Sequence, residues 1–255
     1  MKRLPALNLI FFILVILVNY LANALPLAGN TTGEVSAYFD NLFVPAGYTF
    51  SIWGLIYLAL GIINVRAVLP DPDQHIKETG SKIGPWLIIN FLCNILWLVL
   101  WHNKLIGLSM ILMLLILFSL ISIYIRIDNA QLSIRSGTWW SVKSAFSLYL
   151  GWILVASIAN GAAFLSFHDI NMLLKPAVWL TIMLIIAGGF GIFFLARFKD
   201  PVPALVIIWA LGGIYAKYQL RAGVPEFPLT IISIITLLLV VYTVWIVVFS
   251  PYRTR

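Results

Sequence analysis

The stretch LIGLSMILMLLILFSLISIYI, residues 105–125, decides the fold class of this protein. Its apolar residues follow one another without alternation, and it holds no charged side chain. A helix needs about 20 apolar residues to cross the hydrocarbon core of a bilayer. Backbone groups in lipid must be paired within the spanning structure, and an uninterrupted apolar run favours a helix over the alternating strand of a barrel.

Similar runs recur along the whole chain. Of its 255 residues, 62% are hydrophobic and 10% are charged, which excludes an ordinary soluble domain. We therefore predict an all-α integral membrane protein with eight transmembrane helices. The predicted spans are Leu9–Leu25, Tyr48–Val68, Ile83–Trp101, Leu105–Ile125, Ser144–Phe167, Pro176–Ala196, Val202–Ala216 and Phe227–Phe249.

The basic residues predict the orientation of these spans. With the N-terminus inside, the inner face receives 12 of the 16 Lys and Arg residues and the outer face receives 4. The positive-inside rule therefore favours both termini inside, which requires an even number of spans. The net charge of +7 comes from basic residues in short loops. The sequence has no basic run with interleaved aromatic residues, so we expect the lipid bilayer as the partner and not nucleic acid.

The N-terminus also resembles a signal peptide. Lys2 and Arg3 precede an apolar stretch, and Ala22-Asn23-Ala24 fits a cleavage site. Because the polar Asn19 interrupts the apolar stretch, we expect the first helix to be retained.

Three connectors are long enough to have a structure of their own. The first outer loop, residues 28–47, is rich in turn residues at its start and aromatic at its end. It is either a lid over the helix ends or a solvated connector. The inner segments 69–82 and 127–143 are expected to be polar connectors, and Trp139 and Trp140 are expected at the headgroup level.

The predicted spans lack the groups that most membrane chemistry needs. Their cores hold no Asp, Glu, Lys, Arg or His, which argues against a proton-coupled carrier and against hydrolysis. His102 and His168 lie near the outer surface, where we expect them to be solvated rather than to bind a metal or a haem iron. Cys93 is expected to be a buried, inert thiol.

Aromatic and amide side chains remain. Asn90 and Asn94 share one face of the third span, close to Trp97. The fifth span carries Tyr149, Trp152, Ala156 and Asn160 along one face. Because an amide that faces lipid is costly, we expect Asn94 and Asn160 to point into the bundle. This cluster is either interhelical packing or a pocket for a flat hydrophobic ligand.

These residues resemble three motifs of the tryptophan-rich sensory protein family, also called the translocator protein or peripheral-type benzodiazepine receptor family. The segment FVPAGYTFSIWGLIY, residues 43–57, resembles the entry to the family's second helix. Asn94 and Trp97 resemble the Asn-x-x-Trp of its third helix, and the Tyr149 to Asn160 pattern resembles its fifth helix.

The resemblance implies a five-helix bundle over residues 1–170, with residues 171–255 as an extension of three helices. In the family, a pocket under the first loop accepts porphyrins and other hydrophobic ligands, and the protein is often a homodimer. Carried over by position, the ligand-binding residues are Tyr48, Phe50, Trp53, Asn94, Trp97, Trp152, Ala156 and Asn160. Neither a catalytic residue nor a metal site follows from these motifs, and the only cofactor-like group implied is a porphyrin or haem-like ligand.

Two departures limit what the resemblance implies. Ala46 and Tyr48 stand where the family usually has proline and tryptophan, and Gly161–Phe164 lacks the Tyr and Arg linked to sterol recognition.

From the aromatic and amide cluster and the resemblance, we expect a membrane receptor or carrier for a hydrophobic small molecule, in the cytoplasmic membrane of a bacterium. A light-dependent porphyrin-degrading enzyme and a structural or regulatory membrane module remain as alternatives.

Overall fold

The computed structural model describes residues 3–25, 27–39, 41–70, 74–129, 142–219 and 226–249, and every regular element in these ranges is helical. The predicted all-α membrane fold is therefore confirmed. The long helices are α1 Arg3–Ala24, α3 Ile52–Val68, α5 Trp86–His102, α6 Ile106–Asp128, α7 Ser144–Phe167, α8 Pro176–Phe193, α9 Val202–Gln219 and α10 Glu226–Phe249. The short ones are η1 Leu27–Gly29, α2 Thr32–Tyr38, η2 Gly47–Ser51, α4 Gln74–Ile83, η4 Ile170–Leu173 and the π-helix η5 Phe194–Phe198.

Seven helical segments in the described ranges are long and apolar enough to cross a membrane. An eighth candidate consists of α5 together with the preceding α4, from which it is bent by 66°. The prediction that residues 69–82 form a plain polar connector was wrong, because α4 occupies much of this segment. Ile76 and Ile83 lie seven residues apart on one buried face of α4, a weak apolar pattern among polar neighbours.

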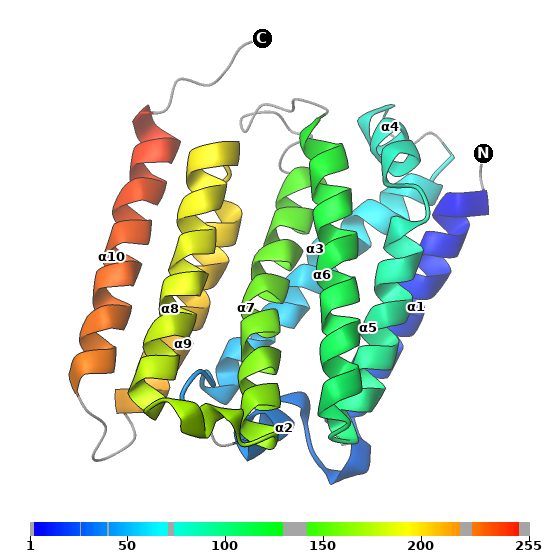
Figure 1. Ribbon diagram of the computed structural model, residues 1–255. Coiled ribbons are helices and arrows are strands. Elements are labelled where there is room, and N and C mark those ends of the chain that lie inside the picture. The colour runs from blue at the N-terminus through cyan, green and yellow to red at the C-terminus, as the bar shows by residue number, and fades with distance from the viewer. Residues whose placement is uncertain are drawn as a thin grey trace.

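The helices form a bundle in which α8, α9 and α10 stand beside the other five long helices (Figure 1). Within the five-helix core, α5 packs against α1 and α6, α7 packs against α6 and α3, and α1 packs against α3. The first turn of α1 and the last turn of α10 lie at the same end of the bundle, as an even number of spans requires (Figure 1). Trp139 and Trp140 lie outside the described residues.

The helix α9 joins the last three helices to the core at two glycines. A Cβ on Gly151 of α7 would lie 2.9 Å from Cα of Pro203. A Cβ on Gly213 of α9 would lie 2.0 Å from Oγ1 of Thr49 in η2, which follows the first loop. Both distances are shorter than non-bonded contacts allow, so only glycine lets Pro203 and Thr49 lie this close to the two helices.

The first loop packs as a lid over the ends of the helices, so the prediction of a solvated connector was wrong and that of a lid was right. Its helix α2 starts with a capping box, in which Thr31 accepts a hydrogen bond from the Glu34 amide and Glu34 accepts one from the Thr31 amide. Val35, Phe39 and Phe43 of this loop are buried. The apolar face of the segment therefore covers the bundle.

Candidate functional site

A cavity of about 360 Å³ lies between α1, the lid and the start of α3. Its volume falls in the range of small-molecule sites. Four aromatic and three polar side chains dominate its wall, and none of the described residues that line it carries a charge. The lining residues are Ile16, Asn19, Tyr20, Asn23, Thr32, Phe50, Trp53 and Tyr57.

The polar side of the cavity connects α1 to the lid. The Asn23 amide nitrogen donates to the carbonyl of Asn19 at 2.9 Å, and the Asn23 side-chain oxygen accepts from the Thr32 backbone amide at 3.3 Å. The hydroxyl of Thr32 is buried and has no hydrogen-bond partner within the described part of the chain. A polar group on a ligand can therefore bond to this hydroxyl without displacing an existing partner.

The aromatic side of the cavity is a layer of rings from η2, α3 and α7. The Trp53 ring stacks on Tyr57 at a centroid distance of 5.3 Å. Trp152 meets the rings of Phe50 and Trp53 edge to face, at 5.7 Å and 6.3 Å. Tyr149 also meets the Trp53 ring edge to face, at 5.8 Å. Such edge-to-face contacts fix ring orientation and build a rigid apolar wall.

Behind the rings, buried amides link helices through two short chains of hydrogen bonds. In the first chain, Asn19 donates to Asn94 at 3.2 Å and Asn94 donates to the Tyr149 hydroxyl at 3.1 Å. In the second chain, the Trp97 indole donates to Asn160 at 2.9 Å, and Asn160 donates to the Ser109 hydroxyl at 3.3 Å. Asn94 and Asn160 are both buried, which confirms that they point into the bundle.

The structure brings together only part of the predicted ligand-binding set. Phe50 and Trp53 line the cavity, and Trp152 touches both. Asn94 reaches the cavity through Asn19.

The other predicted residues lie away from the cavity wall. Trp97 stacks on Trp101, whose indole donates to the Thr32 carbonyl of the lid at 3.3 Å. Asn160 pairs with Trp97, and Ala156 is half-buried against the core. Tyr48 is 53% exposed and packs against Trp209 of α9.

A second cavity of about 520 Å³ continues along α1 and α3. It shares Ile16 and Tyr57 with the first, so the two form one groove between these helices. Among the described residues that line the two cavities, Arg66 is the only charged one. Its remaining lining residues are apolar: Phe12, Leu58, Gly61, Ile62 and Val65.

Residues 5–249 match the model of the family described as TSPO-like protein. The chain belongs to this family. The match extends through α8, α9 and α10, which the resemblance to the five-helix proteins does not cover. No curated protein and no solved structure matches the chain. Membership supports a membrane-bound protein that binds hydrophobic ligands.

Sequence reasoning missed the residues of α1 that line this candidate cavity. Asn19 and Asn23 are four residues apart and therefore lie on one face of a helix, which could have marked them as a pair. Asn19 was instead interpreted only as an interruption of the apolar stretch. No sequence pattern marks Thr32 as a cavity residue, because its position depends on how the lid folds.

The two outer histidines of this TSPO-like protein, His102 and His168, lie in different environments. His102 is buried, which contradicts the expected solvated position, because the last turn of α5 turns this face toward the protein interior. Its Nδ1 lies 2.8 Å from the Leu98 carbonyl. His168 is exposed as expected. The described residues contain no group of three or more His, Cys, Asp or Glu that could hold a metal ion. Cys93 is a buried free thiol, as predicted.

Proposed function

We propose that this protein is a membrane receptor or carrier that binds a hydrophobic small molecule in the cavity between α1, the lid and α3. One observation carries the proposal: the cavity has an aromatic wall, a few amide and hydroxyl groups, and no charged lining residue. Such a wall suits a flat apolar ligand, and the few polar groups fix its orientation. The membership in the TSPO-like family supports the same class of ligand.

For the ligand itself we propose a tetrapyrrole such as a porphyrin. A macrocycle against Trp53 and Tyr57 would extend past Ile16 into the second cavity. Arg66 at that cavity would then pair with a carboxylate of the ligand. The porphyrin is here a ligand or cargo, and the proposal requires no resident cofactor.

Porphyrin titration of the purified protein tests both statements, with tryptophan fluorescence as the readout. We expect Trp53→Ala to raise the Kd about tenfold. One lost ring contact is worth about 1.4 kcal/mol, which corresponds to this factor. The matched control is Trp86→Ala, because Trp86 packs against Phe118 and lines neither cavity. Equal affinities in wild type and Trp53→Ala would refute the site. Arg66→Gln tests the tetrapyrrole, since an uncharged hydrophobic ligand would not respond to it.

A second candidate function is light-dependent porphyrin breakdown. The adjacent rings of Trp53 and Trp152 support it, because neighbouring indoles suit electron transfer and need no acid–base pair. Illumination of the porphyrin complex would give a product with a new absorption spectrum, lost in Trp152→Phe. A porphyrin spectrum that stays unchanged under light removes this candidate.

The third alternative, a structural or regulatory module, gains support if no hydrophobic ligand binds while Asn160→Ala lowers stability. The homodimer implied by the family resemblance also stays a prediction, and the mass of the protein in lipid nanodiscs tests it. Fractionation of the native host's membranes tests the bacterial cytoplasmic membrane as its location.

A further inference from the structure

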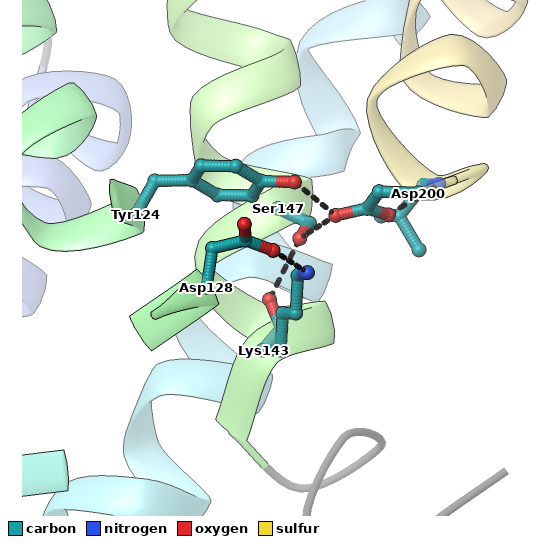
Figure 2. A network of polar contacts seen from close by, with 6 residues as sticks. Tyr124, Asp128, Lys143, Ser147 and Asp200 are labelled. Atoms are coloured by element: carbon teal, nitrogen blue, oxygen red, sulfur yellow. Dashed lines mark hydrogen bonds and ion pairs between the residues drawn. The ribbon is translucent and has the colours of Figure 1, made fainter. Parts of the chain in front are cut away.

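A second polar cluster lies away from the ligand cavity, where the turn between α8 and α9 meets the core (Figure 2). Its centre is Asp200, a carboxylate with no exposed surface. An ionisable side chain buried in a membrane protein is costly, and it is retained where it has a role. The described residues show how this charge is held.

Both oxygens of the Asp200 carboxylate accept hydrogen bonds. Oδ1 accepts from the Val202 amide at 3.0 Å and so caps the first turn of α9. Oδ2 accepts from the Tyr124 hydroxyl of α6 at 2.9 Å and from the Ser147 hydroxyl of α7 at 2.6 Å (Figure 2). One side chain therefore links the last three helices to two helices of the core.

The Ser147 hydroxyl has two possible acceptors for a single proton. It lies 2.6 Å from Asp200 Oδ2 and 2.8 Å from the Lys143 carbonyl. With Asp200 ionised, the hydroxyl donates to the carboxylate. With Asp200 protonated, the carboxyl O–H donates to Ser147, and Ser147 turns its own proton to the Lys143 carbonyl. Both states of Asp200 are then fully hydrogen-bonded without movement of a helix.

The elements that carry and flank this pair also carry charged side chains. Lys143 forms an ion pair with Asp128 and lies 5.4 Å from the centre of the Tyr124 ring. The Asp128 side chain is 28% exposed, whereas that of Lys143 is buried. On η5 and the turn after it, Arg197 lies over the ring of Phe198, and Lys199 lies over the ring of Trp245.

We propose that Asp200 is a reversible proton-binding site at the seam between the five-helix core and the last three helices, with Ser147 as the hydroxyl that reverses its hydrogen bond. Proton uptake forms an O–H bond on the carboxylate and breaks no covalent bond. It weakens the hydrogen bonds that join α6 and α7 to the start of α9, because a neutral acceptor binds donors less strongly than an ionised one. It also removes the cost of burying a charge, which is the larger of the two effects on Asp200.

Burial of Asp200 also favours proton uptake. It raises the pKa of Asp200 above its ordinary value of 3.8, although the hydrogen bond from Ser147 and the charge of Lys143 oppose the shift. The proton is therefore taken up at a higher pH than at an exposed aspartate.

Infrared difference spectroscopy of the full chain in lipid nanodiscs tests the proposal. We expect a protonated-carboxyl band that disappears as pH rises, with a midpoint above about 4, and that is missing in Asp200→Asn. Tyr124→Phe and Ser147→Ala should each raise this midpoint by about one pH unit, because each removes a charge-assisted hydrogen bond. Ser147→Thr keeps a hydroxyl and should restore it.

The control is Ser157→Ala, which removes a hydroxyl from the same helix α7 that bonds only to the Ile153 carbonyl. A midpoint at the ordinary aspartate value, or equal shifts in Ser147→Ala and Ser157→Ala, would overturn the proposal. If Asp200→Asn does not fold, the Tyr124→Phe and Ser147→Ala midpoints decide, because both retain the carboxylate. None of these residues lines the ligand cavity, so the outcome is independent of porphyrin binding.

Discussion

At the scale of the residue, small side chains and buried amides hold this bundle together. Hydrophobicity does not distinguish a neighbouring helix from lipid, so close contact and hydrogen bonds must provide the difference. Gly213 against Thr49 is one such contact, and the pair Trp97 and Asn160 is another.

Gly213→Ala should destabilise the protein by about 1–3 kcal/mol, because its Cβ would overlap Oγ1 of the buried Thr49 and the lid would have to shift. Thermal unfolding in detergent measures the loss. The adjacent Gly212→Ala is the matched control, since a Cβ there meets nothing within 4 Å. We expect Gly212→Ala to be neutral or slightly stabilising, and equal losses in both variants would contradict the contact.

Asn160→Ala should cost about 1–3 kcal/mol, because it leaves the buried Trp97 indole without its acceptor. The comparison is Asn103→Ala, whose exposed amide bonds only to the Val99 carbonyl and which should change stability little. A loss near the average of about 0.6 kcal/mol for a polar contact between membrane helices would mean that the lipid-embedded state finds a substitute partner.

At the scale of the element, the lid helix α2 has seven residues and depends on its first turn. A helix this short is unstable alone, so its capping box and the packing of Val35 and Phe39 keep it folded. The hydrogen bonds from the Thr31 amide and hydroxyl lower the pKa of Glu34.

Thr31→Ala should cost the lid helix about 1 kcal/mol and increase hydrogen exchange of its amides, while Thr31→Ser should retain most of the protection. The pKa of Glu34 is lowered in the folded state, so its contribution is complete above the ordinary value of 4.5 and is lost as pH falls through the lowered pKa. Exchange in α2 should therefore also rise in acid. Exchange that is unchanged in Thr31→Ala would show that packing alone keeps the helix folded.

The same scale shows what the sequence could predict. The predicted span Ser144–Phe167 coincides with α7, because hydropathy reports the thickness of the bilayer directly. The helix α4 was missed, since its two buried isoleucines are diluted by polar neighbours. The burial of Asp200 was also missed, because the pattern around it describes a connector between two spans and not the side chains that fold over it.

In the candidate cavity, the predicted residue set includes two of the aromatic lining residues and none of the polar ones. Phe50 and Trp53 were found through their resemblance to a family motif. Asn19 and Thr32 come from a helix and a loop whose packing against α3 cannot be deduced from hydropathy. Tyr48, which the motif includes, instead faces α9, because this chain has a helix there to receive it.

At the scale of the whole molecule, Asp200 couples stability to pH. Its pKa is raised in the folded state, so the folded protein binds more protons than the unfolded chain between 3.8 and that raised value. Stability should therefore fall as pH rises through this window, and Asp200→Asn should flatten the fall. Unfolding measured across this range, with the exposed Asp169→Asn as control, checks the sign. A slope that persists in Asp200→Asn would assign it to other groups.

Two side chains of α9, outside the five-helix core, bond to the main chain of the lid and of η2 directly after it. The Trp209 indole donates to the Thr49 carbonyl at 3.0 Å, and the Tyr218 hydroxyl donates to the Leu42 carbonyl at 2.9 Å. Neither residue lines the cavity. On the proposed function, their loss would leave every contact of the bound molecule in place and shorten its residence time, because dissociation waits for the lid to open. Helix α9 would then slow ligand release, and Trp209 or Tyr218 variants would raise the dissociation rate constant without removing a ligand contact.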